Sequence, residues 1–218
     1  MVFLVLIGCD TGGMQQFDGV KMSDYFAFDG AVRANTYNNA DTEAVDWQML
    51  VEKKTPTTVE DGRELVTMEY INLNTSEVLG SVQWSSVASD DVRVHGHSIG
   101  ATGEFITFDP PISVTDGDDA MRMGDEVVSE TTDSAGTAWT FTSTFVESVS
   151  ACPSTAQDDF IKCVRMTIDD GDGDAMAGPL FSGEFTLVAA WGVVYQTIPG
   201  WESEWELTDI DYTAEGDE

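Results

Sequence analysis

Aspartates and glycines crowd the stretch 169–174, a composition that could bind calcium. Calcium takes about six to eight oxygen ligands, and glycines between the carboxylates permit the tight turns that such a loop needs. We therefore take Asp170, Asp172 and Asp174 as candidate calcium ligands. The EF-hand pattern is not met, because neither its glycine nor its final glutamate falls at the required position. A solvated hairpin turn after a strand is the alternative interpretation.

The aspartates of residues 116–119 form a weaker candidate of the same kind. His95 and His97 are the chain's two histidines, and their spacing places them on one face of a strand, beside Arg93. Two imidazoles could ligate a transition metal if carboxylates joined them, but the nearby guanidinium disfavours a cation. We expect both histidines to face solvent, without a metal.

An apolar run at residues 2–7 ends in Leu6-Ile7-Gly8-Cys9. The run is too short to span a bilayer, which takes about 20 helical residues. The motif resembles the bacterial lipobox, with leucine three positions before the cysteine and a small residue just before it. The resemblance implies that Cys9 receives a diacylglycerol and becomes the mature N-terminus. Since no basic n-region precedes Cys9, we expect the true start upstream of Met1, or a truncated chain.

This anchor suggests a division of the chain. We expect a signal-peptide remnant at 1–9, a flexible glycine-containing tether at 10–24, one all-β domain at 25–214 and an acidic tail at 215–218. The domain could comprise two packed halves that meet near 109–124, where Asp109-Pro110-Pro111 reads as a break.

With Cys9 lipidated, Cys152 and Cys163 remain as an even pair. In an oxidising envelope compartment they could form a disulfide that closes a short loop. Two separate thiols are the alternative. A zinc site is not expected, because the histidines lie far away in sequence.

The charge is strongly acidic, with 40 Asp and Glu against nine Lys and Arg and a net charge of −31. Such a surface repels nucleic acid and anionic lipid headgroups, so we expect no nucleic-acid partner. Solubility in a salty habitat explains the charge more simply than a specific cation-binding role. The 42% hydrophobic content still permits a packed core.

Alternation of apolar and polar residues dominates from residue 30 onward and predicts antiparallel strands. No long stretch has the period of a helix. We predict an all-β fold with little helix: a curved antiparallel sheet, a partly open barrel or a sandwich of about ten strands. The expected strands lie at 45–51, 66–70, 78–84, 92–98, 104–108, 139–145, 160–168, 181–187, 192–198 and 201–207.

The segment Asp24-Tyr25-Phe26-Ala27-Phe28-Asp29-Gly30, followed by Thr36-Tyr37, resembles the "YFPL-x-G" start of uncharacterised bacterial lipoproteins. Met123-Gly124-Asp125 and the stretch 183–194 resemble later phrases of the same family. Ala27 replaces the usual proline, and no tryptophan lies between Gly30 and Tyr37. The resemblance implies an open barrel-like or curved-sheet lipoprotein domain and no particular reaction.

No nucleophile elbow, zinc-protease motif or phosphate-binding loop occurs in the sequence, and carboxylates are too abundant to be diagnostic. We therefore expect a noncatalytic lipoprotein of the cell envelope, periplasmic or surface-facing, held at the membrane by its lipid. It would act as a binding or structural module for an apolar small molecule or an envelope protein. A calcium-stabilised extracellular interaction domain is the alternative, and an envelope hydrolase is a minor one.

Overall fold

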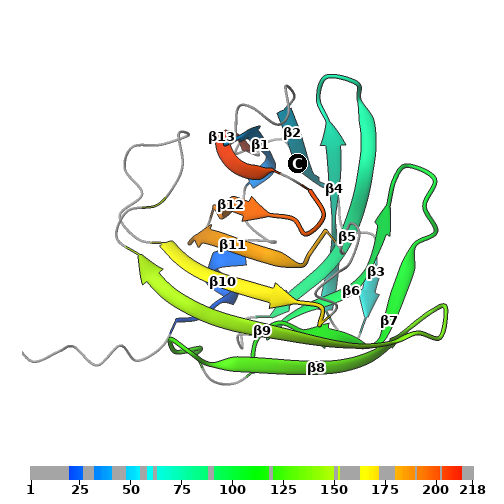
Figure 1. The fold of residues 1–218 in the computed structure, drawn as a ribbon, viewed down its shortest axis with the longest axis vertical. Helices are drawn as coiled ribbons and strands as arrows, with labels where there is room; N and C mark the ends of the chain where they lie inside the picture. Colours follow the sequence, from blue (N-terminus) through cyan, green and yellow to red (C-terminus); the bar gives the residue numbers. More distant parts are fainter. Residues whose placement is uncertain are drawn as a thin grey trace, which may run out of the picture.

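The alternating runs form antiparallel strands in this computed structural model (Figure 1). It describes residues 20–26, 32–40, 48–54, 58–60, 63–87, 91–117, 120–149, 152, 163–171, 180–189, 191–201 and 203–212. The elements are α1 (Ser23–Phe26), β1 (Val32–Asn39), β2 (Gln48–Lys53), β3 (Thr58–Glu60), β4 (Arg63–Asn72), β5 (Glu77–Val87), β6 (Asp91–Ile99), β7 (Ile106–Ser113), β8 (Glu126–Asp133), β9 (Ala138–Val149), β10 (Cys163–Asp169), β11 (Gly183–Val188), β12 (Gly192–Thr197) and β13 (Glu204–Tyr212).

These strands form one sheet that closes on itself. From β4 to β13 each strand pairs with its neighbours in sequence, and β1 lies between β13 and β2. Pairing of β2 with β4 completes a barrel of twelve antiparallel strands, while β3 pairs only with β4 in the described part of the chain. The all-β, antiparallel prediction is confirmed. The closed ring corrects the expected partly open barrel or sandwich of about ten strands, because β2 passes β3 to reach β4.

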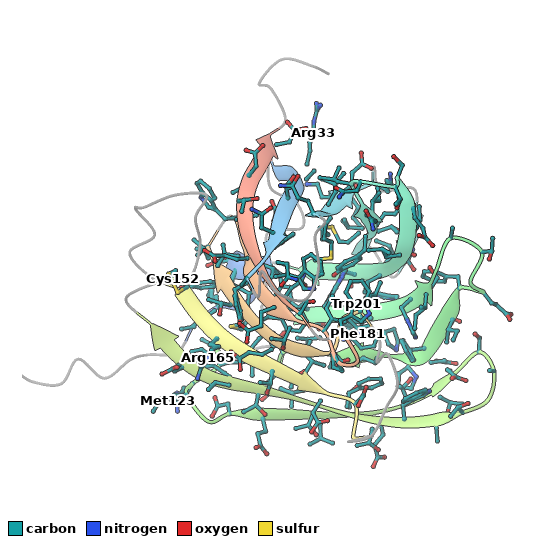
Figure 2. All side chains as sticks on the ribbon, turned by 45° about the horizontal axis from the view of Figure 1, so that its top comes forward. Arg33, Met123, Cys152, Arg165, Phe181 and Trp201 are labelled. Carbon is teal, nitrogen blue, oxygen red and sulfur yellow. A yellow bond between two sulfur atoms is a disulfide. The ribbon has the colours of Figure 1, made fainter. Side chains whose placement is uncertain are left out.

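Large side chains pack the interior of the barrel. Phe181 is fully buried, and its ring centroid lies 5.3 Å from that of Phe141 and 5.8 Å from that of Phe108. Trp84 meets the same ring edge-on at 6.4 Å. Figure 2 shows Phe181 within the ring of strands. Aromatic side chains thus supply much of the core.

The Asp109-Pro110-Pro111 segment lies inside β7 rather than at a break between two halves. Because proline cannot donate to a strand ladder, β7 pairs with β6 before and after these residues. On the other edge of β7, side chains of β8 form hydrogen bonds with its backbone. Thr131 Oγ1 donates to the Pro110 carbonyl at 2.6 Å, and Ser129 Oγ accepts from the Ser113 N–H at 3.1 Å. The sheet therefore continues through this segment.

Among the described residues, packing onto the barrel begins at Val20, within the segment 10–24 that we expected to be a tether. Val20 and Met121 exchange two backbone hydrogen bonds, of 2.8 and 3.0 Å, and Met22 is fully buried. The following helix α1 contacts β5, β6, β11 and β12. The ring centroid of its buried Phe26 lies 5.4 Å from that of Trp84. Apolar side chains at Val20, Met22 and Phe26 explain why this segment joins the core.

Candidate functional site

The candidate calcium loop begins where β10 ends. Asp169 Oδ1 accepts the N–H of Gly171 at 2.9 Å, as in an ordinary turn that an aspartate stabilises locally. Asp170 is half-buried, whereas Asp172 and Asp174 lie outside the described residues. Within the described part of the chain, no three His, Cys, Asp or Glu side chains are arranged to hold a metal ion. Calcium binding here stays a prediction.

The second acidic candidate borders a polar hollow of about 300 Å³. Asp116, Asp125 and Glu126 line this hollow together with Arg122. Asp125 Oδ2 accepts the backbone N–H of Arg122 at 2.6 Å, so this carboxylate already has a partner. The nearby guanidinium also opposes a bound cation. The other aspartates of residues 116–119 lie outside the described residues.

The predicted disulfide between Cys152 and Cys163 is present, with Cα atoms 5.7 Å apart. Cys163 begins β10 and is fully buried, and Figure 2 shows Cys152 near the start of the same strand. The bridge thus fixes one end of a core strand. Cys9, the predicted lipidation site, lies outside the described residues.

Removal of this bridge is expected to lower the free energy of unfolding by about 3 kcal/mol. In the chain-entropy description, a cross-link over a loop of about this length restricts the unfolded chain by that amount, and the two cysteines are 11 residues apart. Urea unfolding of the Cys152→Ser variant beside the oxidised wild type measures the loss. The wild type under reducing agent is the control and should show a similar loss. Unchanged stability in both would contradict the prediction.

The two histidines lie on opposite faces of β6, contrary to our expectation. Trp84 of β5 pairs with Val94, and Gln83 pairs with Gly96, so His95 is an extra residue in β6. Such a bulge changes which face the following side chains occupy. Both histidines are buried, 6% and 5% exposed, so the predicted solvent-facing pair is wrong.

His97 points into the aromatic core. Its ring stacks on Phe108 at 5.7 Å and meets Phe181 edge-on at 5.5 Å, and its Nδ1 has no hydrogen-bond partner. Burial lowers the pKa of His97 to about 4, against an opposing effect of the Asp133 carboxylate. Hydrogen bonds from the Trp139 indole and neighbouring backbone groups in turn lower the pKa of Asp133. His97 is therefore a neutral core residue near pH 7.

His95 forms a contact that could suggest a nucleophile and its base. Its Nε2 lies 2.8 Å from the Oγ of Ser85 on β5, within the reach that such catalysis requires. Ser85 is fully buried, so a substrate cannot reach its hydroxyl. Ser85 also follows the inward-facing Trp84 and thus faces away from the barrel interior. The pair joins β5 to β6 at the bulge and gives no support for hydrolysis.

A cleft is lined by residues of α1, β1, β2, β4, β5, β11 and β12. The nearby ladder between β12 and β13 comprises the pairs Tyr195–Glu206, Gln196–Trp205 and Thr197–Glu204, while the other edge of β13 pairs with β1 as far as Tyr212. Side chains of β1 bond to the freed carbonyl groups of β12. Tyr37 OH donates to the Val193 carbonyl at 2.8 Å, and Asn35 Nδ2 lies 3.4 Å from the same oxygen.

The cleft has a volume of about 50 Å³, and its walls are mainly aromatic and aliphatic. Trp84 and Trp191 are among the lining residues. The almost fully buried amide side chains of Asn35 and Gln196, which are 5% and 1% exposed, also line the cleft. No aspartate or glutamate occurs among the described residues that form the wall.

The sequence pattern did not predict these amides as a site. Asn35 and Gln196 lie at inward positions of β1 and β12, where apolar residues are the rule. A polar side chain at an inward strand position was the available signal. This signal could not show that Asn35 of β1 and Gln196 of β12 line the same cleft.

A Tyr37→Phe variant should lose about 1–2 kcal/mol of stability, because the Val193 carbonyl loses its shortest side-chain donor. Tyr37 is 1% exposed, and burial raises the pKa of its phenol, so the group is neutral and donates at every ordinary pH. Denaturant unfolding measures the change. Tyr195→Phe, on the half-buried side of β12, is the control and should change stability less. An unchanged Tyr37→Phe midpoint would contradict this bond's role.

Comparison with known proteins gave no match to a family model, a curated protein or a solved structure. The described residues contain no helix with the length and apolar character needed to cross a membrane.

Proposed function

We propose that this chain is a noncatalytic lipoprotein of a bacterial cell envelope, anchored through Cys9, whose barrel serves as a binding or structural module. The disulfide between Cys152 and Cys163 is the observation that carries the proposal. Such bonds persist in oxidising compartments, such as the periplasm and the cell surface, and are rare in the cytosol. The sequence Leu6-Ile7-Gly8-Cys9 supplies the matching export and anchoring signal.

The barrel's construction supports binding more than catalysis. Large side chains fill much of the core in the described part of the chain, and the cleft beside them measures about 50 Å³, whereas pockets for ligands of ordinary size span about 300 Å³ or more. The cleft that Asn35 and Gln196 line instead offers a small site with mainly apolar walls and two polar side chains. This arrangement suits a small ligand held by a preformed site.

Metabolic labelling with an alkyne fatty acid tests the anchor. The full chain, with a basic extension before Met1 to supply the n-region, is expressed in a bacterial host and fractionated. We expect lipid label and membrane association in the wild type and in a Cys152→Ala control, and the loss of both in Cys9→Ala. Label that persists in Cys9→Ala, or an unlabelled wild type in the soluble fraction, would refute anchoring through Cys9.

A further inference from the structure

One row of side chains crosses five neighbouring strands of the barrel: β13, β1, β2, β4 and β5 (Figure 1). Backbone pairing places Asp209, Thr36, Leu50, Ile71 and Val78 next to one another in this order. Adjacent strands lie about 4.8 Å apart, so the row extends for about 19 Å along the sheet. A partner segment of about six extended residues would match this length.

Leu50, Ile71 and Val78 form an apolar strip on the outside of the barrel. Their strand neighbours Met49 and Tyr70 are buried in the core, so alternation turns Leu50 and Ile71 outward. None of the three residues of the strip packs against the core cluster, and all three are partly exposed. Apolar side chains that adjoin across three strands are candidates for an interaction surface, whereas scattered single ones need no explanation.

Carboxylates lie at one end of this strip and along one side of it. Asp209 and Asp211 are exposed on β13, and neither forms an ion pair with another residue that the structure describes. In the neighbouring row, Glu52 and Glu69 lie directly opposite each other and share Lys54. Two carboxylates with one ammonium leave this side negative. The face is therefore apolar from β2 to β5 and acidic at β13.

The charge of the chain indicates which kind of partner fits this face. A second copy would bring the same carboxylates and a further net charge of −31, and anionic lipid headgroups would also be repelled. A segment with basic residues at one end and apolar residues at the other complements both parts of the row.

We propose that the outer face of β13, β1, β2, β4 and β5 docks a positively charged, amphipathic segment of a partner protein. Apolar side chains of the segment pack on Leu50, Ile71 and Val78, and its basic side chains lie over Asp209 and Asp211. This gives a partner class to the binding role proposed above and rests on that role. Its failure would leave the labelling test of the anchor unaffected, so the two proposals fail separately.

Three capped peptides of equal length separate the two parts of the face: KKKGLLL, KKKGSSS without the apolar end, and EEEGLLL with the charge reversed. Binding to the full chain is followed by calorimetry at low salt, where surface charges are least screened. We expect saturable binding of KKKGLLL and about tenfold weaker binding of each of the other two, since each loses one part of the contact. Equal affinity of KKKGLLL and either of the others, or no saturation by about 1 mM KKKGLLL, would overturn the proposal.

Ile71→Thr should weaken KKKGLLL binding about tenfold, and Asp209→Asn about threefold. The matched controls lie on β8, outside the proposed face: Val128→Thr changes a valine that is 61% exposed, and Glu130→Gln removes one exposed charge. If the controls weaken binding as much, the peptide does not recognise this face and the proposal fails. Asp209→Asn changes an exposed side chain whose Oδ1 can still accept from the Ile210 N–H, so the test survives even if Ile71→Thr does not fold.

Discussion

A Phe181→Ala variant should unfold with a free energy about 4 kcal/mol lower than that of the wild type. Phe181 is fully buried just before β11, and four aromatic rings surround it: Trp84, His97, Phe108 and Phe141. Truncation removes the central ring of this cluster, and strands joined by continuous hydrogen bonding cannot collapse fully into the space. Urea unfolding followed by tryptophan fluorescence measures the loss as a shifted midpoint at constant slope.

Two further variants show whether the effect comes from the lost volume. Phe181→Leu keeps most of the apolar volume and should cost about 1–2 kcal/mol. Phe105→Ala removes the same ring from a side chain that is 37% exposed, so its cost should be about 1 kcal/mol. If Phe181→Ala proves no more destabilising than Phe105→Ala, Phe181 is not central to the core.

Alternation predicted the strands whose inward positions are apolar and missed those whose inward positions are polar. In β8 the buried positions are Ser129, Thr131 and Asp133. In β1 they are Asn35, Tyr37 and Asn39. Hydrophobic periodicity cannot detect such strands, and neither of them is among the strands that we predicted. Their inward polar groups form specific hydrogen bonds instead, including those of Thr131 to Pro110 and Tyr37 to Val193.

Closure of the barrel was not predictable from local patterns. Most strands pair with their sequence neighbours, but the β2–β4 pairing skips β3, and β1–β13 joins opposite ends of the chain. Turn residues can predict hairpins between consecutive strands, but they cannot predict pairing between strands that are far apart in the sequence. Likewise, the bulge at His95 changed the predicted face of His97, because one inserted residue reverses the alternation that follows.

The position of the cleft follows from the same long-range geometry. β13 lies between β12 and β1; its pairing with β12 ends at Tyr195–Glu206, whereas its pairing with β1 continues to Tyr212. Asn35 and Tyr37 bond to the carbonyls exposed there, at the expense of apolar packing. Carbonyl groups of β12 that the ladder with β13 does not pair are therefore bonded by side chains of β1.

Acidification should remove about 3 kcal/mol of stability through His97 alone. Its pKa is about 4 in the folded protein and 6.5 when unperturbed, and each unit of difference corresponds to about 1.4 kcal/mol. The lowered pKa means that the unfolded chain takes up the proton first. The stabilisation is therefore fully present above pH 6.5 and is lost as the pH falls toward about 4. Urea unfolding across this range measures the loss.

The His97→Phe variant isolates this contribution, since a phenyl ring can keep the stacking on Phe108 and has no proton to bind. Other groups, including the many carboxylates, titrate alike in both proteins, so they cancel in the difference between the two stability curves. That difference should change by about 2.5 kcal/mol between about pH 8 and about pH 4.5. Parallel curves would mean that His97 titrates normally and is therefore accessible to water. A widening gap identifies this buried imidazole as the barrel's acid-sensitive point.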